Sequence, residues 1–172
     1  MSAAAAQLQT PPGQPVRVLM VCLGNICRSP TAHGVLEQLV RDAGLAGRIE
    51  IDSAGTDSGH VGQPPDARAQ RHARARGYDL SSQRARKLHA QDFHAFDLML
   101  VMDDANEARA QALRPPGAPA RILRLTDFCT HHRAHAVPDP YYGGADGFED
   151  VLDLVEDACA GLLAQLRPSL RR

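Results

Sequence analysis

The sequence lacks an excess of charge of either sign, a long apolar run and a regular cysteine pattern. Its formal net charge is −1 over 172 residues, so its overall charge gives no indication of binding to nucleic acid or to an anionic membrane. No apolar stretch is long enough to span a bilayer. The four cysteines, at positions 22, 27, 129 and 159, are irregularly spaced and do not suggest a disulfide scaffold. We therefore expect a cytoplasmic protein in a reducing compartment.

The N-terminal stretch "MSAAAAQLQTPPGQP" has neither the basic start nor the continuous apolar segment of a signal peptide. We expect residues 1–15 to form a disordered tail. The chain as a whole has an ordinary composition, since apolar residues make up 44% of it and charged residues 23%. This length and composition predict one domain with a real core, over residues 16–168.

Apolar patterning within this domain alternates between strand and helix. Near-continuous apolar runs with β-branched residues predict buried strands, and segments with one apolar face predict helices. Ser29 is expected to be the N-cap of the first helix, with Pro30 at its first position. The expected strands are 16–23, 48–55, 96–103 and 120–125, the expected helices are 29–44, 65–77, 103–113 and 148–166, and a long polar loop is expected over 126–147. The order predicts an α/β fold: a doubly wound, four-stranded parallel sheet with helices on both faces.

The segment "CLGNICRS" (22–29) joins the first strand to the first helix. In such a sheet, ligands bind beyond the carboxyl ends of the strands. A loop there can direct backbone N–H groups and the helix dipole at one anion, and Arg28 adds a planar fork that matches phosphate oxygens. The same positive surroundings favour a thiolate at Cys22, which makes it a nucleophile, and Ser29 can donate a hydrogen bond to it. A buried structural cysteine and a surface arginine are the alternatives, but they do not explain the whole set.

Two motifs together give the sequence a family resemblance. Cys-x5-Arg-Ser at the end of the first strand, with "DPYY" (139–142) before the last helix, resembles the low-molecular-weight protein tyrosine phosphatases over about residues 16–168. The resemblance implies that Cys22 is the nucleophile, Arg28 binds phosphate and Asp139 is the general acid and then the base. Ser53 is implied to support the loop through Asn25. The implied substrate-binding residues are Leu23, Gly24, Asn25, Ile26, Cys27, Ser29, Tyr141 and Tyr142.

The resemblance also implies a reaction and its partners. The expected activity is hydrolysis of phosphotyrosine and small aryl phosphates through a cysteinyl-phosphate, without cofactor or metal. The expected partner is a phosphotyrosine protein, with a bacterial tyrosine kinase as a candidate, and neither nucleic acid nor membrane. Ile26 matches phosphotyrosine-type relatives, whereas phosphoarginine-type relatives tend to have threonine there. Gly59, Gln83 and His33 depart from the family, which often has an aromatic residue, a histidine and a glutamate at these positions; His60 is a candidate to replace the aromatic wall.

Several alternatives stay open at this point. A thiol-dependent arsenate reductase shares the fold and loop but needs further redox cysteines, and a phosphotyrosine-binding pseudoenzyme should have lost a catalytic residue. Asp139 before Pro140 is equally typical of a turn. Cys27 could form a protective disulfide with Cys22 or be a packed thiol. The histidines of "CTHHRAH" (129–135) fit no zinc spacing and are expected to be solvated. The arginines of 68–87 are also expected to form a solvated face, with attraction of acidic phosphopeptides as the alternative.

Overall fold

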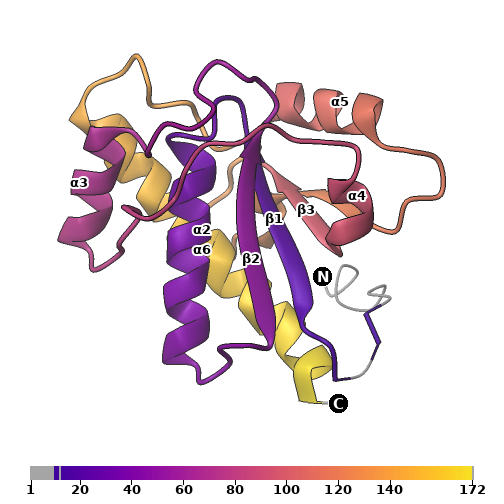
Figure 1. Cartoon of the computed structure of the whole chain (residues 1–172). Coiled ribbons are helices and arrows are strands. Elements are labelled where there is room, and N and C mark those ends of the chain that lie inside the picture. The colour runs from indigo at the N-terminus through magenta and orange to yellow at the C-terminus, as the bar shows by residue number, and fades with distance from the viewer. Residues whose placement is uncertain (1–9, 12, 172) are drawn as a thin grey trace.

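The computed structural model describes residues 10, 11 and 13–171 and shows a parallel sheet between two layers of helices (Figure 1). The strands lie in the order β2-β1-β3-β4, and all neighbouring strands are parallel. This confirms the predicted fold class. In chain order the elements are β1 (Val16–Cys22), α2 (Arg28–Asp42), β2 (Ile49–Gly55), α3 (Ala67–Ala75), α4 (Asp92–Ala95), β3 (Leu98–Val101), α5 (Asp104–Leu113), β4 (Arg121–Arg124), the 3-10 helix η1 (Leu125–Phe128), α6 (Ala145–Leu166) and the 3-10 helix η2 (Arg167–Arg171).

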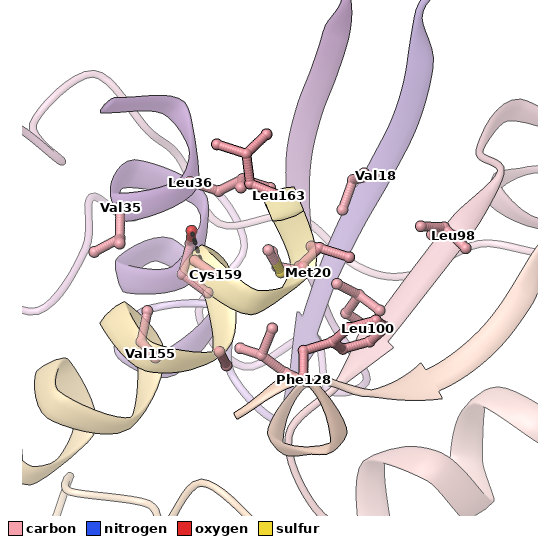
Figure 2. Close-up of a cluster of buried hydrophobic side chains, with 14 of the residues drawn as sticks. Val18, Met20, Val35, Leu36, Leu98, Leu100, Phe128, Val155, Cys159 and Leu163 are labelled. Atoms are coloured by element: carbon pink, nitrogen blue, oxygen red, sulfur yellow. Dashed lines mark hydrogen bonds between the residues drawn. The ribbon is translucent and has the colours of Figure 1, made fainter. Parts of the chain in front are cut away.

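The central strand β1 supplies both faces of the core. Val18 and Met20 point to the side where α2 and α6 pack, and Figure 2 shows them among Leu36 and Leu163 from these helices. The alternate residues of β1 belong to a second cluster, on the side of α4 and α5. A strand with apolar neighbours on both faces needs a near-continuous apolar sequence, which is why the run over 16–23 is so hydrophobic.

The position of β1 also determines where the functional loop lies. The chain leaves β1 to form β2 on one side and later returns to form β3 on the other side. The carboxyl end of β1 is therefore the point where the winding of the sheet reverses, and a crevice opens there in doubly wound folds. Residues 22–28 occupy this point, as the sequence predicted.

The element boundaries agree with the prediction within a few residues, with one informative error. The first helix begins at Arg28, its N-cap is Cys27, and no side chain caps it. The prediction that Ser29 is the N-cap is wrong because its hydroxyl hydrogen-bonds to the Asn25 side chain and to the thiol of Cys22. The sequence analysis also missed α4, η1 and η2, which are too short to show a periodic pattern.

The expected solvated face of arginines over 68–87 is only partly correct. Arg76 bridges α3 to α6 through ion pairs with Glu149, Asp153 and Glu156. Arg86 pairs with two aspartates, and Arg68 pairs with one. These cations therefore hold elements together.

Most of the predicted N-terminal tail, residues 1–9 and 12, lies outside the described residues. At the other end, Leu170 is buried in the cluster beneath α2 and α6. Among the described residues, no helix combines the length and hydropathy that a membrane crossing would need.

One close approach positions the segment that follows β4. Gly161 of α6 lies so near the carbonyl of Phe128 in η1 that a Cβ atom would overlap this oxygen. In an ordinary helix interior, replacing Gly by Ala stabilises the protein by about 0.5–1 kcal/mol. Here we expect Gly161→Ala to lower the free energy of unfolding by about 1–3 kcal/mol, because overpacking against backbone outweighs that gain.

Urea denaturation of the purified variant would test this prediction. The control is Gly59→Ala, because Gly59 is exposed and its Cβ would meet only ordinary contacts. Equal or greater stability of Gly161→Ala would show that η1 and α6 can separate without cost.

Candidate active site

Cys22 ends β1 with its sulfur held by the helix that follows. The Sγ atom lies 3.1 Å from the Ser29 hydroxyl oxygen, and both residues are buried. Ser29 Oγ accepts a hydrogen bond of 2.8 Å from the Asn25 side-chain amide. Because this oxygen already accepts from Asn25, its own hydrogen is available to the sulfur. A hydroxyl that donates to sulfur stabilises a thiolate.

Asn25 holds the loop in shape from its centre. Its φ of 58° places it in the left-handed region, which asparagine tolerates better than most residues. Its amide nitrogen also donates to Ser53 Oγ at 2.9 Å, and its carbonyl accepts from the Arg86 backbone at 3.0 Å. The loop is thereby tied to β2 and to the segment after α3. Gln83, one of the departures from the family, joins the same network 3.4 Å from Ser53 Oγ.

Gly55 lets the loop lie directly on the end of β2. A Cβ atom at this position would be 2.7 Å from the carbonyl oxygen of Leu23 and 3.1 Å from the Asn25 nitrogen. The backbone N–H groups of the next two residues, Thr56 and Asp57, donate to the carbonyls of Cys22 and Leu23. The carbonyls at the start of the loop therefore point at β2.

The guanidinium of Arg28 is buried, with 3% of its side chain exposed. It donates to Asp103 Oδ2 at 2.7 Å and to the Val137 carbonyl at 3.0 Å, and Asp139 Oδ2 lies 3.7 Å away. Burial by itself would lower the pKa of Arg28, but Cys22 and the Asp103 carboxylate outweigh it, so the pKa is raised. Arg28 therefore stays charged beside Cys22.

Asp103 is a functional candidate that the sequence analysis missed. It is the N-cap of α5, where its Oδ1 accepts from the Asn106 backbone while its Oδ2 accepts from Arg28. The available signal was an aspartate directly after a buried strand, at the carboxyl edge of the sheet. This signal is weak because aspartate is a common N-cap whether or not it binds anything else.

Asp139 lies at the rim of the same site, with 39% of its side chain exposed. Its Oδ1 accepts a 3.1 Å hydrogen bond from the Tyr141 backbone, which is the local geometry of an Asx-turn. Pro140, between the two, is buried. Asp139 can therefore be both a turn residue and a functional residue, because the turn directs its carboxylate toward Arg28.

These residues surround a pocket of about 160 Å³ at the carboxyl end of β1. Three predicted residues, Asn25, Ser29 and Ser53, are absent from its wall and support the loop from behind. Asp57, which was not among the predicted site residues, also lines the wall. His60, which was predicted only as a candidate replacement for the aromatic wall, lines it too. The lining residues are Cys22, Leu23, Gly24, Ile26, Cys27, Arg28, Asp57, His60, Asp139, Tyr141 and Tyr142.

Comparison with known proteins agrees with this arrangement. The family model described as low molecular weight phosphotyrosine protein phosphatase matches residues 17–172. The chain belongs to this family. A low molecular weight protein-tyrosine-phosphatase of Streptomyces coelicolor is 42% identical over 154 residues, which are 88% of this chain and 93% of that protein.

Two solved structures are similar in fold as well as in sequence. A protein tyrosine phosphatase from Entamoeba histolytica is 39% identical, with a TM-score of 0.86 over 90% of this chain and 98% of that chain. YfkJ from Bacillus subtilis is 36% identical, with a TM-score of 0.85 over 91% of this chain and 98% of that chain.

His60 forms part of the wall of the pocket. Gly59, the expected departure from the family pattern, does not line the pocket. The ring centroids of His60 and Tyr141 are 6.1 Å apart, and Gln63 Oε1 accepts a hydrogen bond from His60 Nδ1 at 2.9 Å. His60 thus stands across from Tyr141. Tyr142 contacts Tyr141 edge-on and is 94% exposed.

Cys27 is a buried thiol at the wall of the pocket. Burial, with a further contribution from Asp66, raises the pKa of Cys27 well above its usual range, so it is protonated at neutral pH. Cys22 and Cys27 are both free in the structure. A disulfide between them stays a prediction.

The histidines of residues 129–135 lie outside the pocket. His132 pairs with Asp157 of α6 at 2.9 Å, and His135 pairs with Asp104 at 3.0 Å. Over residues 10, 11 and 13–171, no group of three or more histidine, cysteine or acidic side chains is arranged to hold a metal ion.

Asp103 offers a test of how the site is positioned. We expect Asp103→Asn to lower kcat/KM for an aryl phosphate by about 10- to 100-fold, because a misplacement of about 1 Å can cost a factor of this size. In asparagine one of the two accepting oxygens is replaced by an NH2 donor, which would face either Arg28 or the Asn106 N–H, and the negative charge beside Arg28 is lost.

Steady-state kinetics, together with inhibition by inorganic phosphate, would measure the effect. The control is the neighbouring Asp104→Asn, because Asp104 pairs with Arg124 and His135 instead of Arg28. An unchanged kcat/KM in folded Asp103→Asn would remove Asp103 from any role in positioning Arg28.

Proposed function

We propose that this chain hydrolyses phosphotyrosine in proteins through a cysteinyl-phosphate intermediate. The observation that carries the proposal is the convergence of three groups in one pocket. The sulfur of Cys22 lies beside a buried, charged Arg28, and the carboxylate of Asp139 stands at the rim, 3.7 Å from that guanidinium. A nucleophile, an anion binder and a proton donor are the groups that phosphate-ester cleavage needs.

In the first step, the phosphate sits in the loop, bound by backbone N–H groups and Arg28. The Cys22 thiolate attacks phosphorus and forms the S–P bond, while the bond from phosphorus to the phenol oxygen breaks. Asp139 gives its proton to that oxygen, so tyrosine leaves as a neutral phenol. Ser29 stabilises the thiolate before attack through the 3.1 Å contact.

In the second step, Asp139, now a carboxylate, takes a proton from a water molecule. The resulting hydroxide attacks phosphorus, the S–P bond breaks, and inorganic phosphate and the Cys22 thiolate are restored. One aspartate serves both steps because it stands on the side of the leaving group, which is the side where water enters.

The substrate ring would fit between the aromatic residues of the rim. Tyr141 and His60 face each other across the pocket, and Leu23 is 47% exposed beside them. Ile26 supplies an apolar surface inside the wall, which favours an aryl group over a charged guanidinium. Arg68 holds Tyr141 by donating to its carbonyl at 3.0 Å and by lying over its ring.

The geometry of the site favours neither an arsenate reductase nor a phosphotyrosine-binding pseudoenzyme. A thiol-dependent arsenate reductase needs cysteines that can relay a disulfide, but Cys129 and Cys159 do not line the pocket. Cys159 is fully buried, and burial raises the pKa of Cys129 to about 11, so both remain thiols. A pseudoenzyme has no need for Cys22, Arg28 and Asp139 in one pocket. A bacterial tyrosine kinase as the source of its substrates, and a cytoplasmic location, stay predictions.

The first test replaces the nucleophile. We expect Cys22→Ser to show no measurable turnover of p-nitrophenyl phosphate and to bind vanadate or phosphate still, because the hydroxyl is a weak nucleophile whereas Arg28 and the loop amides remain. The matched control is Cys129→Ser, a half-buried cysteine away from the pocket, which should retain activity. Appreciable hydrolysis by purified Cys22→Ser would contradict the assignment.

The second test concerns the proton donor. For substrates with poor leaving groups, we expect Asp139→Asn to slow formation of the cysteinyl-phosphate by about 10²–10⁴-fold. This corresponds to roughly 2.7–5.5 kcal/mol of transition-state stabilisation. The loss should shrink as the leaving phenol becomes more acidic, because an acidic phenol needs little protonation.

The decisive measurement is kcat/KM over a series of aryl phosphates for the wild type and Asp139→Asn. Equal dependence on the leaving group in both proteins would return Asp139 to the role of a turn residue.

A further inference from the structure

A groove leads away from the proposed active site along α5. Its near part is a hollow of about 550 Å³ that shares Leu23 and Asp57 with the wall of the active-site pocket. Its far part is a hollow of about 380 Å³ that shares Thr56 and Arg109 with the near part. Neighbouring hollows thus share lining residues, in a series that runs from the pocket at Cys22 to Leu113.

The far part of the groove carries unneutralised positive charge. Lys87 and Arg109 both line it and are exposed, and neither has an ion-pair partner among the described residues. By contrast, Arg76 and Arg86 are each held by two or more carboxylates. Among the described residues that line the groove, Asp57 is the one carboxylate, and it lies at the end next to the active-site pocket.

Apolar side chains lie beside these cations. Leu88 is buried in the wall of the far hollow, and Leu113 is 39% exposed at its rim. Such a surface fits a peptide that presents acidic and aliphatic side chains together. A small phosphate ester would reach neither group.

The near part of the groove contains a polar atom without a partner. Asn106 lines this hollow and is 2% exposed, and its Oδ1 has no hydrogen-bond partner among the described residues. An acceptor left unsatisfied in this way costs free energy. Because this oxygen is buried behind the wall of the hollow, a main-chain N–H of a bound peptide would reach it only if the Asn106 side chain turned toward the groove.

We propose that this groove binds an acidic segment of the substrate protein that lies a few residues from the phosphotyrosine. The proposal rests on the proposed function, because the phosphotyrosine must occupy the pocket at Cys22. Thr56 connects the two sites: its backbone N–H donates to the Cys22 carbonyl at 2.9 Å, and the residue also lines both hollows of the groove. An extended chain advances about 3.3 Å per residue, so a peptide that leaves the pocket along α5 would place successive residues at the near hollow and then at the far hollow.

The position of Asp57 refines the expected substrate. Its carboxylate disfavours an acidic residue immediately next to the phosphotyrosine. Lys87 and Arg109 attract acidic residues farther along. The groove therefore selects acidic residues from the second position onward.

The test compares two phosphotyrosine peptides and one small substrate. One peptide has Glu at the second, third and fourth positions on both sides of the phosphotyrosine, and the other has Gln there. We expect the wild type to hydrolyse the Glu peptide with a kcat/KM about 3- to 10-fold higher at low ionic strength, through two exposed ion pairs. This preference should weaken as salt is added. The third substrate, p-nitrophenyl phosphate, does not extend into the groove.

Charge reversal at the groove should remove this preference. In Lys87→Glu/Arg109→Glu, we expect the two peptides to be hydrolysed equally or the Gln peptide to be preferred, with unchanged kinetics toward p-nitrophenyl phosphate. The matched control is Arg71→Glu/Arg74→Glu on α3, which changes the net charge equally and lies on the opposite side of the molecule from α5 (Figure 1). This control should keep the preference for the Glu peptide.

The possible failures are distinguishable. If the active wild type hydrolysed the two peptides with equal kcat/KM, the proposal that the groove binds an acidic segment would be overturned, and the proposed function would stand. A similar loss of preference in the α3 control would also overturn it, because net charge instead of the groove would then explain selectivity. Absence of hydrolysis of all three substrates would overturn the proposed function and the groove with it.

Discussion

The buried guanidinium of Arg28 is the constraint on which the site depends. An isolated charge in a protein interior is costly, so its neighbours must neutralise it. Asp103 comes from the end of β3, and Val137 and Asp139 come from the segment before α6. A single side chain at the start of α2 therefore gathers segments separated by more than 70 residues in sequence. The same charge that organises these segments is the one that we propose binds the phosphate.

The proposed anion-binding loop is held in its shape by hydrogen bonds within the protein. Asn25 adopts its left-handed conformation and is held there by Ser29, Ser53 and the Arg86 backbone. Gly55 permits the close contact with the end of β2. Preorganised donors cost no rearrangement at the moment of reaction, and this is the main source of electrostatic stabilisation in enzymes. The loop thus owes its shape in part to three side chains that do not line the pocket, namely Asn25, Ser29 and Ser53.

The proposed sites of catalysis and of substrate selection lie on different parts of the surface. The pocket at Cys22 is small and has its charges arranged around one phosphate, whereas the groove along α5 is wider and displays cations that nothing in the described chain neutralises. Asp103 lies between the two, because it caps α5 and also holds Arg28. The helix that would recognise the substrate is therefore anchored through the residue that positions the catalytic arginine.

The sequence by itself determined the alternation of strands and helices, the parallel sheet and the loop after β1. These follow from local patterns, because apolar runs and periodicity are short-range properties. Cys22, Arg28 and Asp139 were also identifiable from their motifs. Only the tertiary structure decided that Asp103 holds Arg28, that His60 takes the place opposite Tyr141, and that the hydroxyl of Ser29 serves the sulfur instead of capping a helix. These outcomes depend on which distant segments meet at the carboxyl edge of the sheet, and a side chain bonds to whatever partner packing brings within reach.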